Sequence, residues 1–114
     1  MKLYLDDTRP VPDNSWTLTK TAQETIQYLI STNVEEISLD HDLGDGNGTG
    51  YDVLFWIEEQ VYTTDYIPPK IINIHTANVV ARKKMEQSLN SIIAKCNNVS
   101  GFVRPALQGE KQCQ

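Results

Sequence analysis

The chain has few cysteines, no long apolar run and no excess of positive charge. Only two of its 114 residues are cysteine, and Cys113 lies in the polar stretch EKQCQ. We therefore expect no disulfide framework, and we predict a reducing, cytoplasmic compartment. No apolar segment approaches the length of a membrane span, and the first apolar stretch, MKLYL, is too short for the core of a signal peptide.

Fifteen acidic residues against ten basic ones give the chain a net charge of −5. We expect no partner in duplex DNA, because surfaces that bind duplexes are basic. A phosphorylated small molecule, a cyclic nucleotide or an RNA end is compatible with this charge. Because the chain has the length and apolar content of one globular unit, we predict a single domain over residues 1–107 and a flexible tail over 108–114.

Short apolar runs alternate with segments of helical periodicity. Thr21 with Glu24, and Thr49 with Asp52, have the spacing of capping boxes, which place helix starts at these positions. Such alternation predicts an α/β fold with a mostly parallel, five-stranded sheet whose ligands bind beyond the carboxyl ends of the strands. The predicted strands are residues 1–5, 16–19, 35–39, 70–74 and 101–103, and the predicted helices are residues 21–31, 49–63 and a third that begins at 79.

Polar side chains follow four of these strands. Because the carboxyl ends of parallel strands meet at one edge of a sheet, we expect these side chains to lie close together. They are Asp6 and Asp7 after the first strand, Asp40, His41 and Asp42 after the third, His75 and Thr76 after the fourth, and Arg104 after the last.

The residue types in this set indicate phosphate chemistry. Carboxylates gathered from separate strands suit Mg²⁺, a hard cation that shares phosphate oxygens with its protein ligands. Arg104 and Thr76 are candidates for binding a phosphoryl group. A carboxylate of the set is a candidate to attack phosphorus or to orient water, and histidine is suited to proton transfer at neutral pH.

Six segments of the chain share a pattern with a known family: YLDD, AQETIQYL, EEISLD, TGYDVLFWI, IINIHTA and GFVRPAL. In this order they resemble the receiver domains of two-component signalling. The resemblance implies a flavodoxin-like, three-layer sandwich. It places Asp6 and Asp7 at a metal, Asp40 at the phosphoacceptor position, Thr76 at the phosphate and Arg104 in place of the usual lysine.

The chain departs from the receiver pattern at three points. Only about ten residues separate the first two strands, so the first receiver helix is predicted to be missing. The loop from Asp40 to Gly50 is longer than usual, which leaves Asp42 as an alternative to Asp40. Arginine at position 104 offers a planar fork where lysine offers a compact charge.

The segments LDDTRP, SLDHDLG and HTAN resemble more closely the cyclic-phosphate-processing receiver domains. This likeness implies a metal-dependent role on cyclic phosphate ends of RNA or on cyclic nucleotides. In that reading Asp6, Asp7 and Asp40 bind Mg²⁺, and Asp40, Asp42, His41 and His75 are the catalytic candidates. Two alternatives stay open: a phosphoacceptor signalling module with a protein partner, and a nucleotide-binding domain without turnover.

Overall fold

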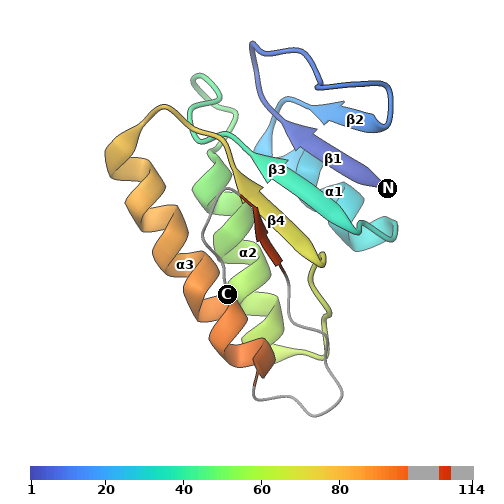
Figure 1. The fold of residues 1–114 in the computed structure, drawn as a ribbon, viewed down its shortest axis with the longest axis vertical. Helices are drawn as coiled ribbons and strands as arrows, with labels where there is room; N and C mark the ends of the chain where they lie inside the picture. The colour runs from blue at the N-terminus through green and yellow to red at the C-terminus, as the bar shows by residue number, and fades with distance from the viewer. Residues whose placement is uncertain (98–105, 109–114) are drawn as a thin grey trace.

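A computed structural model of the protein describes residues 1–97 and 106–108 (Figure 1). The strand predicted at 101–103 and Arg104 lie outside the described residues, as does the tail from residue 109 onward. In chain order the elements are β1 (Lys2–Leu5), β2 (Trp16–Thr19), α1 (Ala22–Ser31), β3 (Glu36–Leu39), α2 (Gly50–Thr63), β4 (Ile71–Ile74), α3 (Val79–Asn97) and β5 (Ala106–Gln108).

The strands form one sheet in the order β2-β1-β3-β4-β5, and every neighbouring pair is parallel. The first four strands have four residues each, and β5 adds a short strand of three residues beside β4. Gln108, which the sequence placed in the tail, belongs to this last strand. The predicted α/β class with a parallel, receiver-like sheet is confirmed.

The helix starts lie where the sequence placed them. Thr21 precedes α1, and its side-chain oxygen accepts a hydrogen bond from the backbone N–H of Glu24 at 3.0 Å. Thr49 and Asp52 form a complete capping box before α2, because each side chain accepts a hydrogen bond from the other's backbone N–H. These bonds satisfy N–H groups that have no partner within the helix.

All three helices pack on one face of the sheet. A single buried cluster contains alternate strand residues, such as Leu3, Ile37 and Ile72, together with side chains from α1, α2 and α3. Strand side chains alternate between the two faces, so the intervening residues, such as Tyr4 and Ser38, point to the opposite face. Figure 1 shows α2 and α3 running beside each other along the sheet.

The opposite face carries no helix among the described residues. Residues 6–15, between β1 and β2, form turns and bends, which confirms that the first receiver helix is missing. A three-layer sandwich was predicted, and the part of the chain that the structure describes makes two of those layers, because every described helix lies on the face of Leu3 and Ile37. None of the described helices is both long and apolar enough to cross a bilayer.

Candidate metal and phosphate site

The last residues of β1, β3 and β4 lie side by side at one edge of the sheet. Leu5 pairs with Leu39, and Leu39 pairs with Ile74. The next residue of each strand extends the hydrogen-bond ladder: the N–H of Asp40 donates to the carbonyl oxygen of Leu5 at 3.0 Å, and that of His75 donates to Leu39 at 2.9 Å. Backbone pairing therefore fixes the residues that follow the strands beside one another.

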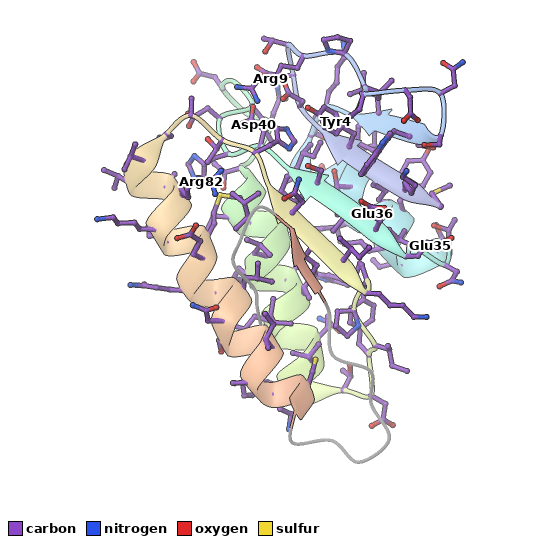
Figure 2. The ribbon with its side chains drawn as sticks, in the orientation of Figure 1. Tyr4, Arg9, Glu35, Glu36, Asp40 and Arg82 are labelled. Atoms are coloured by element: carbon purple, nitrogen blue, oxygen red, sulfur yellow. The ribbon has the colours of Figure 1, made fainter. Side chains whose placement is uncertain are left out.

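Asp6, Asp7 and Asp40 form an acidic cluster. One carboxylate oxygen from each lies within 4.8 Å of the other two. This confirms the predicted convergence of these three side chains, and an all-oxygen set of this kind can bind a divalent metal. Figure 2 shows Asp40 and Arg9 at the same end of the sheet, far from Glu35 and Glu36 at the other end.

Asp6 is fully buried and held by several hydrogen bonds. Its Oδ1 accepts the backbone N–H groups of Thr8 at 2.9 Å and Arg9 at 2.8 Å, and its Oδ2 lies 3.0 Å from Nε2 of His75. Burial by itself would raise the pKa of Asp6, but these hydrogen bonds outweigh it and hold the pKa below its ordinary value. Asp6 is therefore an ionised, fixed member of the cluster.

Asp40 is in a different electrostatic position. Burial raises the pKa of its carboxyl, and the nearby charge of Asp6 raises it further, although hydrogen bonds from the backbone of His41 and the hydroxyl of Thr76 oppose the shift. The charged form of Asp40 is thus disfavoured in the protein without metal. A bound cation would remove this penalty, which makes the cluster suited to one.

His75 lies behind Asp6, on the sheet face that no described helix covers. Its Nδ1 is 2.6 Å from the hydroxyl oxygen of Ser38, and its Nε2 is 3.0 Å from Asp6. The ring stacks on Tyr4 at 4.4 Å between centroids. Burial lowers the pKa of His75 in spite of the neighbouring Asp6. Both ring nitrogens have partners within the protein, as a structural histidine would, and a catalytic role for His75 stays a prediction.

His41 and Asp42 form a pair next to the cluster. Nδ1 of His41 is 2.8 Å from Oδ1 of Asp42, and this bond lowers the pKa of the Asp42 carboxyl. The other oxygen of Asp42 accepts a 3.4 Å bond from the side-chain amide of Asn78, whose backbone N–H donates to Thr76. Within the described residues no hydrogen bond reaches Nε2 of His41, so this nitrogen is free for a ligand. Asp42 itself stands outside the acidic cluster.

Two arginines lie near the end of β4, and neither was among the predicted site residues. Arg9 donates to the carbonyl oxygen of His75 at 2.9 Å, and Arg82 donates to that of Ile74 at 2.9 Å. Arg82 comes from the first turn of α3 (Figure 2). Ser38 was also missed, because a serine within a strand carries no signal of a hydrogen bond to a histidine on the next strand.

An open cavity of about 640 Å³ lies between α1 and the glycine-rich loop 44–48. Gln23, Gln27 and Asn47 contribute amide groups to its wall, and among the described residues that line it Asp52 alone is charged. The loop also borders the acidic cluster, since the position of a Cβ on Gly44 would be 4.0 Å from Oδ2 of Asp7 and 3.5 Å from Nδ2 of Asn47. The cavity and the cluster are therefore neighbours.

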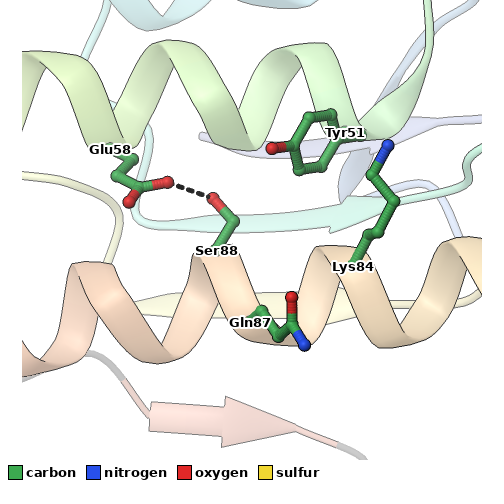
Figure 3. A pocket seen from close by; sticks show the side chains of 5 residues that line it. All are labelled: Tyr51, Glu58, Lys84, Gln87 and Ser88. Atoms are coloured by element: carbon green, nitrogen blue, oxygen red, sulfur yellow. Dashed lines mark hydrogen bonds between the residues drawn. The ribbon is translucent and has the colours of Figure 1, made fainter.

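A second, smaller cavity of about 210 Å³ lies between α2 and α3 (Figure 3). Its polar groups are paired with one another: the Ser88 hydroxyl donates to Glu58 at 2.7 Å, and the Lys84 ammonium lies 4.6 Å from the centre of the Tyr51 ring. These pairs leave few free groups for a ligand. The acidic end of the sheet is the stronger candidate site.

Comparison with known proteins agrees with this geometry. A family model described as the cyclic-phosphate processing receiver domain matches residues 1–91. No curated protein and no solved structure matches the chain. The matched region contains the whole acidic cluster together with His41 and His75, and it ends before position 104. Since it covers most of the chain, the chain belongs to the family of cyclic-phosphate processing receiver domains.

Proposed function

We propose that the protein is a Mg²⁺-dependent phosphoesterase that opens cyclic phosphates, either the 2′,3′-cyclic end of an RNA or a cyclic nucleotide. The observation that carries the proposal is the convergence of Asp6, Asp7 and Asp40, in a chain of this family. Such substrates are compatible with the acidic net charge of the chain. We also propose a cytoplasmic location.

The donor set fits Mg²⁺. This ion favours oxygen ligands, keeps several waters and is usually held by one or two carboxylates together with substrate phosphate. Asp7 and Asp40 would supply those carboxylates. Asp6 already accepts bonds from the backbone and from His75, so at most one acceptor position remains on its Oδ2. When bound, the ion would neutralise charge on the phosphate and lower the pKa of a coordinated water.

Ring opening forms a bond between a water oxygen and phosphorus and breaks one ring P–O bond. One proton leaves the water and another reaches the leaving oxygen. We assign proton transfer to Nε2 of His41, because Asp42 holds Nδ1 and thereby orients the ring. We assign contact with the phosphate to Thr76, and its bonds to Asp40 and Asn78 support this assignment. The phosphate-binding role of Arg104 stays a prediction.

The cavity between α1 and loop 44–48 would receive the organic part of the substrate. Its wall is largely neutral and offers amide groups of Gln23 and Gln27. Such groups match the hydrogen-bonding edges of a base or the hydroxyls of a ribose, whereas no lining residue in the part of the chain that the structure describes offers a cation to a phosphate. The substrate would then span the two neighbouring regions, with its phosphate at the acidic cluster.

The test is incubation of the protein with Mg²⁺ and one of three substrates: 2′,3′-cyclic mononucleotides, RNA with a 2′,3′-cyclic end, or cyclic dinucleotides. Products are separated by chromatography and identified by mass. We expect ring-opened phosphate monoesters that disappear with a chelator and with Asp7→Asn or Asp40→Asn. Asp65→Asn is the matched control, because this exposed carboxylate lies beyond α2 and outside the cluster. Absence of product from all three substrates would count against catalysis.

The phosphoacceptor alternative has its own support. Asp40 directly follows a central strand and bonds to Thr76 beyond the next strand, as a receiver phosphoacceptor site requires. Incubation with acetyl phosphate and Mg²⁺ should then add one phosphoryl mass to the intact protein, and Asp40→Asn should abolish it. Binding of a nucleotide without either product would instead favour the non-catalytic module.

A further inference from the structure

A chain of polar side chains crosses the face of the sheet that no described helix covers, and it ends at the acidic cluster. The side-chain nitrogen of Asn73 donates to the hydroxyl oxygen of Ser38 at 3.3 Å. Ser38 lies 2.6 Å from Nδ1 of His75, and Nε2 of His75 lies 3.0 Å from Asp6. Ser38 is 2% exposed and Asp6 is fully buried, so water does not replace these bonds. The four residues come from β3, β4 and the ends of β1 and β4.

The donors and acceptors of this chain have one consistent direction. The amide nitrogen of Asn73 can only donate, so the hydroxyl of Ser38 accepts there, and its own hydrogen is available to Nδ1 of His75. The Asp6 carboxylate can only accept, so the single ring hydrogen of neutral His75 lies on Nε2, and Nδ1 accepts from the Ser38 hydroxyl. The ring hydrogen points at Oδ2 of Asp6.

The ring of His75 has little freedom to leave this arrangement. It stacks on Tyr4 with an angle of 2° between the ring planes. Arg9 also holds its backbone, through a 2.9 Å bond to the carbonyl oxygen of His75. Since the ring is fixed from two sides, the choice of which nitrogen carries the hydrogen decides how Asp6 is held.

We propose that Ser38 and Asn73 are positioning residues that fix His75 with its hydrogen on Nε2, so that His75 orients the Asp6 carboxylate toward Asp7 and Asp40. The hydrogen-bond directions stand on the geometry alone, whereas their consequence for metal affinity rests on the proposed function. A histidine that orients a carboxylate is typical of the partners that surround metal ligands.

The first test is a ¹⁵N NMR measurement of the His75 ring in the metal-free protein. We expect the hydrogen on Nε2 in the wild type. Asn73→Asp replaces a donor with an acceptor, so the Ser38 hydroxyl should turn toward residue 73 and present its oxygen to Nδ1. Because Nε2 must still donate to Asp6, we expect the ring to gain a second hydrogen on Nδ1. Asn90→Asp, an exposed change on α3, should leave the ring signals as they are. A wild-type ring with its hydrogen on Nδ1, or an unchanged Asn73→Asp variant, would overturn the proposal.

The second test measures Mg²⁺ affinity by calorimetry. Removing a partner behind a metal ligand typically weakens binding by about 10- to 100-fold, and we expect a loss in this range for Ser38→Ala. Ser38→Thr retains the hydroxyl and should recover most of the Mg²⁺ affinity. If Ser38 had only a structural role, Mg²⁺ affinity would not depend on the hydroxyl. Equal Mg²⁺ affinity in Ser38→Ala and wild type would contradict the positioning role. Absence of Mg²⁺ binding in the wild type would instead contradict the proposed function, while the NMR result would still decide the hydrogen-bond directions.

Discussion

Gly50 and the backbone of Asp40 are in direct contact. A Cβ atom built on Gly50 would lie 1.8 Å from the carbonyl oxygen of Asp40 and 2.9 Å from the Cε of Met85. The N–H of Gly50 also donates to the carbonyl oxygen of His41 at 3.2 Å. The first residue of α2 thus packs against the segment that carries Asp40, His41 and Asp42, and only glycine leaves room for this approach.

Gly50→Ala should therefore disturb the site as well as the fold. A clash with backbone cannot be relieved by a side-chain rotation, so the start of α2 and Asp40 must move apart, at a cost of about 1 to 3 kcal/mol in the free energy of unfolding. Denaturant unfolding measures this cost, and calorimetry should show weaker Mg²⁺ binding.

Gly46→Ala is the matched control for this variant. Gly46 has φ of +81° but open space around its Cβ position, so the backbone strain costs about 1 kcal/mol without displacing Asp40. Equal losses of Mg²⁺ affinity in the two variants would contradict the argument.

The sequence predicted those parts of the molecule that local chemistry determines. Thr21 and Thr49 marked helix starts because a cap and its N3 partner are close in sequence. The convergence of Asp6, Asp7 and Asp40 followed from strand order, since parallel strands that cross over right-handedly bring their carboxyl ends together. Neither prediction required knowledge of how distant side chains pack.

The remaining features depend on contacts across the sheet. Whether His75 is free or bound depends on Ser38 of the neighbouring strand, and the pairing of these two residues is set by register, which the sequence does not state. The role of Arg82 depends on the angle at which α3 leaves the end of β4. The number of layers depends on which face of the sheet each helix covers. The apolar periodicity of a helix shows that it packs on the sheet but not on which face.

Replacing Asp40 should stabilise the protein in the absence of metal. Burial and the Asp6 charge raise the pKa of Asp40 above 3.8, so the folded protein binds this proton more tightly than the unfolded chain does. The stability that this group contributes is full below pH 3.8 and is lost as the pH rises through the raised pKa. At neutral pH, Asp40→Asn should therefore raise the melting temperature of the metal-free protein.

Thermal unfolding of the wild type and the variants in the presence of Mg²⁺ completes this test. Binding to the folded state alone raises the melting temperature, so Mg²⁺ should stabilise the wild type and Asp65→Asn while leaving Asp40→Asn almost unchanged. A metal-free Asp40→Asn variant that melts below the wild type would show that the Asp40 charge is favourable in the fold, contrary to our expectation.

Loss of His41 should separate proton transfer from metal binding. A positioned general acid or base typically contributes about 10²- to 10⁴-fold to the rate, and we expect His41→Gln to lower kcat within this range. Mg²⁺ affinity should not change, because His41 is not a member of the acidic cluster. Calorimetry and steady-state kinetics on the same preparation decide this point.

Asp42→Asn should have a smaller effect than His41→Gln. The bond from His41 lowers the pKa of Asp42, so this carboxylate is ionised at neutral pH and orients the imidazole by accepting from Nδ1. The amide side chain retains an oxygen acceptor but loses the charge. If Asp42→Asn abolished the reaction while His41→Gln retained it, Asp42 would be the reacting group and the assignment of the pair would be reversed.

Filling the cavity beside loop 44–48 should discriminate between substrates. Gln27 lines that cavity from α1 and has an exposed side chain, so Gln27→Trp places an indole where we propose the organic part of the substrate binds. We expect KM for a 2′,3′-cyclic nucleotide to rise about tenfold, the cost of roughly 1.4 kcal/mol of lost binding. A small cyclic phosphate without a base, such as glycerol 1,2-cyclic phosphate, should react at an unchanged rate, because it occupies only the acidic cluster.

Gln87→Trp is the control for this variant, since it fills the cavity between α2 and α3 instead. An equal rise in KM for both substrates in Gln27→Trp would mean that the indole disturbs the acidic cluster, and no rise for the nucleotide would place its base elsewhere.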